Sequence, residues 1–219
     1  MKHPRYLLAA TLLLATITGH AVASDPAFDA ELLSIQQSWA KVNYETPAGD
    51  ARVKAFDALE KRAEGFVKQH PGRAEALIWE GIIESSYAGA KGGLGALGLA
   101  KEARGNLEAA LKIDPGALDG SAYTSLGTLY YKVPGFPLGF GDHDKARELL
   151  KKALEINPNG IDPNYFFAEF LYEQGDYSKS LQYLDRASKA PPRPGREVAD
   201  KGRQADIAAL AARVKAKMS

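Results

Sequence analysis

The chain has 219 residues, and its 28 lysine and arginine side chains nearly balance its 27 aspartate and glutamate side chains. This balance gives no electrostatic attraction to nucleic acid or to anionic lipid, so we expect neither as a partner. The sequence contains no cysteine, which excludes disulfide bonds and thiol chemistry. Stability must therefore come from packing alone.

The first 23 residues are typical of a secretory signal peptide. Lys2 and Arg5 precede an apolar run over residues 6–17, and the small-residue triplet 21–23 follows. The sequence predicts cleavage before Ser24 and a periplasmic location for the remaining single domain. The alternative is an uncleaved membrane anchor, but a span needs about 20 apolar residues and threonines interrupt this run. No cysteine follows the run to carry a lipid, so we expect no stable membrane anchor.

Residues 24–73 predict an N-terminal helical hairpin. Asp25 is suited to cap a helix, and Pro26 is suited to its first position, where a missing N–H does no harm. Two stripes of apolar residues at three- and four-residue intervals then mark one buried face on each of two helices. The stripes are Leu32, Ile35, Trp39 and Val42, then Phe56, Leu59, Ala63 and Phe66. We expect a degenerate version of the hairpins that follow.

Residues 74–192 contain three copies of one helical-hairpin pattern. A small residue is followed by leucine, alanine and proline at fixed spacing: Ala103, Leu107, Ala110 and Pro115; Ala146, Leu150, Ala153 and Pro158; Ser180, Leu184, Ala187 and Pro192. Together with the helix that precedes each copy, this pattern resembles the tetratricopeptide repeat (TPR). Among the preceding helices, the stretch Tyr123-x2-Leu-Gly-x2-Tyr130 matches the repeat best. The resemblance implies an all-α fold, a TPR-like α-solenoid of stacked antiparallel helical hairpins with a concave binding surface.

Two repeats carry extra residues between their paired helices, over 88–98 and 133–141. Because both segments occupy the same place in their hairpins, we expect two inserted loops that project from one edge of the solenoid. Residues 193–219 predict a C-terminal capping helix of the kind that solenoids need at their ends. Its apolar face is formed by Val198, Ile207, Leu210 and Val214.

The second insert and the segment before the capping helix carry a narrower resemblance. Two stretches are similar to the T component of tripartite ATP-independent periplasmic (TRAP) transporters. They are residues 130–142, Tyr-Tyr-Lys-Val-Pro-Gly-Phe-Pro-Leu-Gly-Phe-Gly-Asp, and residues 190–197, Ala-Pro-Pro-Arg-Pro-Gly-Arg-Glu. This resemblance implies a periplasmic helical-repeat protein that associates with a solute-binding protein or a transporter subunit.

No catalytic constellation is visible in the sequence, so we expect a protein that is not an enzyme, with no metal and no cofactor. Glu80 and Glu84 lie one helical turn apart, as do Glu169 and Glu173, and we interpret both pairs as solvated helix faces. The G-x-G-x-x-G match over residues 93–98 follows a helix rather than a strand, so it indicates a flexible insert and not a dinucleotide site. The Asp-His-Asp triplet at 142–144 favours a helix cap over a metal site.

The best candidate site is the second insert, in which Phe136, Leu138 and Phe140 stand among proline and glycine. They form either a semi-rigid apolar finger that contacts a partner or a cover for the edge of the core. The TPR template adds groove-facing positions, although some of these could belong to the core between repeats. They are Ile78, Ile82, Thr124, Thr128, Tyr131, Tyr165, Glu169 and Tyr172.

These features lead to two hypotheses about function. The first is a periplasmic interaction module whose groove and loops hold a protein partner, as an accessory to a solute transporter. The second is a binding protein for a small hydrophobic solute enclosed by the repeats. Self-association through the aromatic loop is a further possibility.

Overall fold

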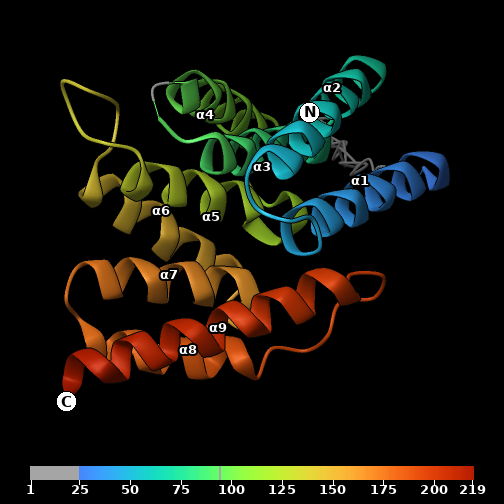
Figure 1. Ribbon diagram of the computed structural model, residues 1–219. Helices are drawn as coiled ribbons and strands as arrows, with labels where there is room; N and C mark the ends of the chain where they lie inside the picture. The colour runs from blue at the N-terminus through green and yellow to red at the C-terminus, as the bar shows by residue number, and fades with distance from the viewer. Residues whose placement is uncertain (1–24, 94) are drawn as a thin grey trace, which may run out of the picture.

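The computed structural model describes residues 25–93 and 95–219, and nine α-helices form within that part of the chain (Figure 1). They are α1 (Pro26–Tyr44), α2 (Asp50–Gln69), α3 (Ala74–Lys91), α4 (Gly95–Ile113), α5 (Ala117–Lys132), α6 (His143–Ile156), α7 (Ile161–Glu173), α8 (Tyr177–Ser188) and α9 (Glu197–Met218). The predicted all-α class is confirmed. The predicted signal peptide lies outside the described residues. Across the described range, every helix is too short or too polar to cross a lipid bilayer.

Several helices begin where the sequence supplies an acceptor for their first backbone N–H groups. The Asp25 carboxylate accepts hydrogen bonds from the amides of Ala27 and Phe28 at 3.1 and 3.2 Å, and Pro26 follows at the first helical position. Asp142 caps α6 in the same way and accepts from two amides at 2.9 and 3.0 Å. Both helix starts predicted from the sequence are therefore confirmed.

Two of the three repeat hairpins are held together by a glycine against a leucine. Gly81 of α3 faces Leu107 of α4, and a Cβ added at Gly81 would lie 2.8 Å from the leucine Cγ. Gly127 of α5 faces Leu150 of α6 with the same spacing of 2.8 Å. Hydrogen replaces a methyl group at the point where the two helices cross, so the backbones approach closely enough for each leucine to be fully buried.

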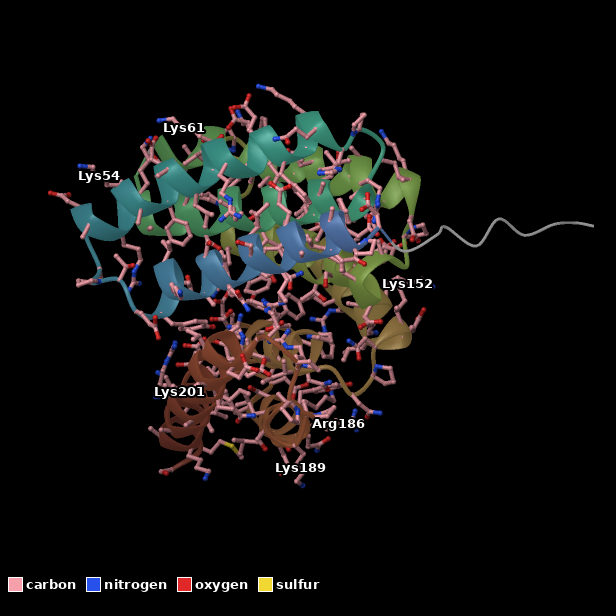
Figure 2. All side chains as sticks on the ribbon, turned by 90° about the vertical axis from the view of Figure 1, so that its right-hand side faces the viewer. Lys54, Lys61, Lys152, Arg186, Lys189 and Lys201 are labelled. Atoms are coloured by element: carbon pink, nitrogen blue, oxygen red, sulfur yellow. The ribbon has the colours of Figure 1, made fainter. Side chains whose placement is uncertain are left out.

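The helices form two layers. The even-numbered helices α2, α4, α6 and α8 lie outside, and charged side chains such as Lys54, Lys61 and Arg186 point from them into solvent (Figure 2). The odd-numbered helices lie inside, each in contact with the next odd-numbered helix from α1 to α9. Helix α9 also packs on α1, and Figure 1 shows it running past α7 toward that helix. The inner layer is therefore closed on itself.

Closure is made by hydrogen bonds and by one close approach between the first and last helices. Gln37 Nε2 donates to the carbonyl oxygen of Gly195 at 3.1 Å, and the Tyr44 hydroxyl donates to Asp206 Oδ2 at 3.0 Å. The Tyr44 ring rests on Gly202, where an added Cβ would overlap the ring carbons. A residue with a side chain at this position would push α9 away from α1.

The structure differs from the sequence-based expectation at the first insert. Helix α3 continues to Lys91 and α4 begins at Gly95, so most of residues 88–98 lengthen the two helices instead of forming a flexible loop. Alanine and leucine between the glycines supply enough helix propensity to extend both helices. The second insert is a loop, as expected, and it lies beside the first, since a Cβ on Gly139 would be 3.4 Å from Leu97.

Candidate functional site

The inner layer encloses a cleft of about 1220 Å³. Its walls come from α1, α3, α4, α5, α7 and α9, and from the connecting segments 133–138, 157–160 and 190–196. Small-molecule pockets typically range from about 300 to 1,000 Å³, so this cleft has room for a large ligand or a segment of extended chain. Because α1 and α9 both contribute walls, the cleft depends on the closure of the inner layer.

One wall of the cleft is built around the two tryptophans of the sequence. Trp39 of α1 and Trp79 of α3 meet edge to face with ring centroids 5.7 Å apart. Trp39 Nε1 donates a hydrogen bond to Ser86 Oγ at 2.9 Å, and that hydroxyl donates to the carbonyl oxygen of Ile82 at 2.8 Å. These hydrogen bonds satisfy the polar atoms of Trp39 and Ser86, and this stretch of the wall presents mainly apolar surface.

A network of ion pairs forms another part of the cleft. Asp162, at the start of α7, accepts from Arg193 at 2.6 Å and from Arg203 of α9 at 2.9 Å. Burial alone would raise the pKa of Asp162, but the two guanidinium groups outweigh it and lower the pKa to about 2. Arg193 also pairs with Asp200, and Arg203 with Asp206. Both arginines are thus neutralised by carboxylates.

Arg196 is a third arginine in the cleft, and its surroundings differ. Its Nη1 donates to the amide oxygen of Gln36 at 3.3 Å, and its guanidinium lies 4.9 Å from the centroid of the Trp79 ring. No carboxylate of the described residues lies within ion-pair distance of it. Burial, together with the nearby charge of Arg193, lowers the pKa of Arg196 to about 10. Arg196 Nε and Trp79 Nε1 are both buried and have no hydrogen-bond acceptor among the described residues.

The loop over residues 133–141 contributes Val133, Pro134 and Leu138 to the cleft lining and is fixed at its base. The amide of Gly141 donates to the carbonyl oxygen of Pro134 at 2.9 Å, and the amide of Asp142 donates to that of Tyr130 at 2.8 Å. Figure 1 shows the loop, drawn in yellow between α5 and α6, projecting from the helices. The base is therefore ordered by backbone hydrogen bonds.

The three apolar side chains of this loop have different environments. Phe140 is half-buried, with its ring 5.5 Å from that of Tyr130 and under the guanidinium of Arg104 at 4.5 Å. Phe136 is 94% exposed and Leu138 is 72% exposed, and Leu138 also lines the cleft. Phe140 covers the edge of the core, which was one of the two alternatives, whereas Phe136 and Leu138 form an exposed apolar tip.

Comparison with known proteins identifies the repeat. Residues 138–214 match the sequence profile described as tetratricopeptide repeat. This part of the chain is therefore similar to the tetratricopeptide repeat family. A comparison with curated protein sequences gives no match.

Solved structures agree with the TPR fold. The chain is similar to the thermophilic TPR protein TTC0263 of Thermus thermophilus, with a TM-score of 0.53 and 16% identity over 83% of this chain and 99% of that one. It is also similar to yeast Tom70, with a TM-score of 0.50 and 16% identity over 87% of this chain and 34% of that one. The described helices thus form a TPR-like solenoid, as the sequence predicted.

The groove positions transferred from the TPR template divide into two groups. Ile82, Thr124 and Thr128 line the cleft, as the template predicts. Ile78 does not, because it is fully buried in the core between α3 and α4. Tyr165 is also buried, under the guanidinium of Arg203 at 4.4 Å. The close packing of the repeat helices turns these two positions into the core.

The remaining template positions are not part of the cleft lining. The hydroxyl of Tyr131, whose pKa is raised by burial and by Glu169, donates to Glu169 Oε2 at 2.6 Å. Glu169 also pairs with Lys132 at 3.1 Å. Tyr172 packs against Tyr177 and under Arg213. These contacts give Tyr131, Glu169 and Tyr172 structural roles, and none of the three is among the residues that line the cleft.

The pair Glu80 and Glu84 is not a solvated face, contrary to the sequence interpretation. Their residues are only 7% and 4% exposed, between α2 and α4. Burial, followed by repulsion from Glu60 and Glu64, raises the pKa of Glu80 to about 7. Burial raises the pKa of Glu84 to about 8, although Asn106 Nδ2 donates to it at 3.0 Å. No cluster of three or more potential metal ligands occurs among the described residues.

Sequence reasoning missed Trp39, Trp79 and Arg196 as residues of the cleft. Trp39 fits a regular apolar stripe and was interpreted as core, and nothing near Arg196 in the sequence distinguishes it from the other arginines of the segment. Arg196 reaches the two tryptophans because the segment before α9 contacts α1, and its hydrogen bond to Gln36 joins residues 160 positions apart. Only a prediction of this closure would have brought Arg196 to this wall.

Proposed function

We propose that this protein is a non-catalytic interaction module that holds a protein partner through its cleft and the 133–141 loop. The observation that carries the proposal is the exposed tip of that loop. Phe136 and Leu138 present apolar surface to solvent on a loop whose base is held by backbone hydrogen bonds. A fixed loop loses little conformational entropy on binding, and aromatic side chains often dominate binding energy. The TPR solenoid is a suitable support for such a contact.

We propose a periplasmic location and an accessory role for a solute transporter. Support for export comes from the basic, apolar and small-residue segments of positions 1–23. Support for the transporter link comes from the similarity of residues 130–142 and 190–197 to the TRAP T component. Both segments border the cleft, so a partner that contacts the loop would also lie close to its opening.

The test replaces Phe136 with a photoreactive phenylalanine analogue in cells of the organism that encodes this protein. Ultraviolet irradiation of intact cells, followed by mass spectrometry, should yield one major adduct with an exported solute-binding protein or transporter subunit. The same analogue at Ile113, which is 48% exposed on α4, is the matched control. Leu138→Ala should weaken the adduct, because it removes half of the apolar tip. An adduct pattern equal to that of the control would contradict the proposal.

The size of the cleft supports a second candidate function, the binding of a hydrophobic solute. A volume of about 1220 Å³ with tryptophan walls is larger than a protein contact through the loop requires. Purified protein can be denatured and extracted into organic solvent, and the extract can be weighed by mass spectrometry. A molecule present at near-stoichiometric amount would favour this candidate, and its absence together with a specific loop adduct would favour the first.

A further inference from the structure

We infer that the cleft binds a carboxylate with an apolar body, whose head group is received by Arg196 and Trp79. The inference rests on the second candidate function, the binding of a solute, and adds the chemistry of the ligand. It starts from two donors with no acceptor among the described residues, Arg196 Nε and Trp79 Nε1, which belong to two neighbouring residues of the cleft lining.

A buried donor without an acceptor is costly, and native structures rarely contain one without a reason. Only 5% of the Trp79 surface is exposed, so water has little access to its N–H group. Arg196 carries five N–H groups, and Gln36 Oε1 accepts from one of its nitrogens at 3.3 Å. The two side chains are already in contact, with the guanidinium 4.9 Å from the ring centroid. A carboxylate bound to the guanidinium would therefore lie close to the Trp79 ring.

The charge of Arg196 favours an anion at this point of the cleft. Four lining residues are basic and two are acidic, the basic ones being Lys132, Arg193, Arg196 and Arg203 and the acidic ones Asp119 and Asp162. Arg193 and Arg203 share Asp162, and Lys132 is paired with Glu169 and Glu173. Arg196 is the lining cation for which no carboxylate of the described residues serves as a partner. Its guanidinium can therefore receive a negatively charged group of a ligand.

A carboxylate matches this site in shape as well as in charge. The planar guanidinium of arginine can donate two parallel hydrogen bonds to the two oxygens of a carboxylate. Beyond the arginine, the cleft continues along Trp39, Ile82 and Leu97, which offer apolar surface. The ligand would therefore place its head at Arg196, beside Trp79, and its apolar body along this wall.

The test uses decanoate as the probe and decan-1-ol as its uncharged counterpart. Because both tryptophans line the cleft, their fluorescence reports its occupancy, and isothermal titration calorimetry gives the affinity. Decanoate should bind more tightly than decan-1-ol. Arg196→Met should weaken decanoate binding about ten- to a hundredfold, the range expected for hydrogen bonds to a charged group, and leave decan-1-ol unchanged.

Controls separate the head-group contact from a general loss of structure. Arg186→Met is matched to Arg196→Met, because Arg186 also covers an aromatic ring, that of Tyr183 at 4.9 Å, but lies outside the cleft on α8. It should leave decanoate binding unchanged. Arg196→Lys keeps the charge without the planar fork and should have an intermediate affinity, and circular dichroism shows whether each variant is folded.

The outcomes distinguish the inference from the function on which it rests. Equal decanoate affinity in the folded Arg196→Met variant and the unaltered protein would overturn the head-group assignment and leave the solute function standing. Saturable binding of decan-1-ol with no preference for decanoate would do the same. Failure of both probes to bind the unaltered protein would overturn the inference and the solute function together.

Discussion

The buried carboxyl group of Glu84 should make the stability of this protein fall as the pH rises. In the folded state its pKa is about 8, against an ordinary value of 4.5. Between these two values the folded protein holds a proton that the unfolded chain has released. Stability is highest below about pH 4.5 for this group, decreases as the pH rises toward 8, and is constant above that. Glu80, with a pKa of about 7, adds to the same trend.

Glu84→Gln should remove this penalty. A shift of the Glu84 pKa from 4.5 to about 8 corresponds to a loss of at most about 5 kcal/mol in the free energy of unfolding at high pH. Relaxation and water penetration around a buried charge reduce its effective cost, so we expect a gain of about 2 kcal/mol in the free energy of unfolding at about pH 9. At about pH 5 the carboxyl group is protonated and neutral like the amide, and the gain should be small. Asn106 can donate to the glutamine oxygen as it does to Glu84.

The assay is urea unfolding followed by circular dichroism at about pH 5, 7 and 9, which spans the interval between the two pKa values. For a chain of this size, about 2 kcal/mol corresponds to a rise of about 4–8 °C in the melting temperature. Glu148→Gln is the control, because that side chain is 71% exposed and pairs with Lys145 across one turn of α6. It should change the free energy of unfolding by less than about 0.5 kcal/mol at every pH. An equal effect of Glu84→Gln at the lowest and the highest pH would refute the reasoning.

Three further substitutions test the packing. Gly202→Ala should lower the melting temperature and weaken ligand binding, because its Cβ would overlap the Tyr44 ring and separate α9 from α1. The control is Gly105→Ala, in open space on α4, which should stabilise the protein by up to about 1 kcal/mol. A stabilised Gly202→Ala protein would disprove the tight contact. Gly127→Ala should lower the free energy of unfolding, measured in urea, by about 1–3 kcal/mol, because its Cβ would lie 2.8 Å from Leu150. An unchanged free energy of unfolding would mean that α5 and α6 can separate freely. Asp142→Ala should cost about 1 kcal/mol by removing the cap of α6, measurable in the same assay, and an unchanged stability would show that the cap is dispensable.

Local patterns were sufficient to predict the hairpins of this fold. The pairing of Gly127 with Leu150 and the cap at Asp142 are visible in the sequence because their partners lie within one repeat. The repeat spacing also identified the TPR class. These features depend on helix periodicity and on turn residues, which act over short distances along the chain.

The cleft could not be predicted to the same extent, because it depends on contacts between distant parts of the chain. The template placed Thr124 and Thr128 correctly, but Tyr165 faces α9, which a general repeat does not include. Likewise, Glu80 and Glu84 have charged side chains at ordinary surface spacing, and only the packing of α2 and α4 around α3 buries them. Burial of a charge is a property of the assembled layers and leaves no local signal.

Closure of the inner layer connects the fold to both proposed activities. The segment 191–196 reaches α1 because the cap helix α9 packs there, and this contact places Arg196 over Trp79. The 133–141 loop borders the same cleft through Leu138. A partner bound at the loop would therefore lie beside a solute bound in the cleft. If both activities are present, Phe136→Ala should weaken the partner contact and spare decanoate affinity, whereas Arg196→Met should do the reverse.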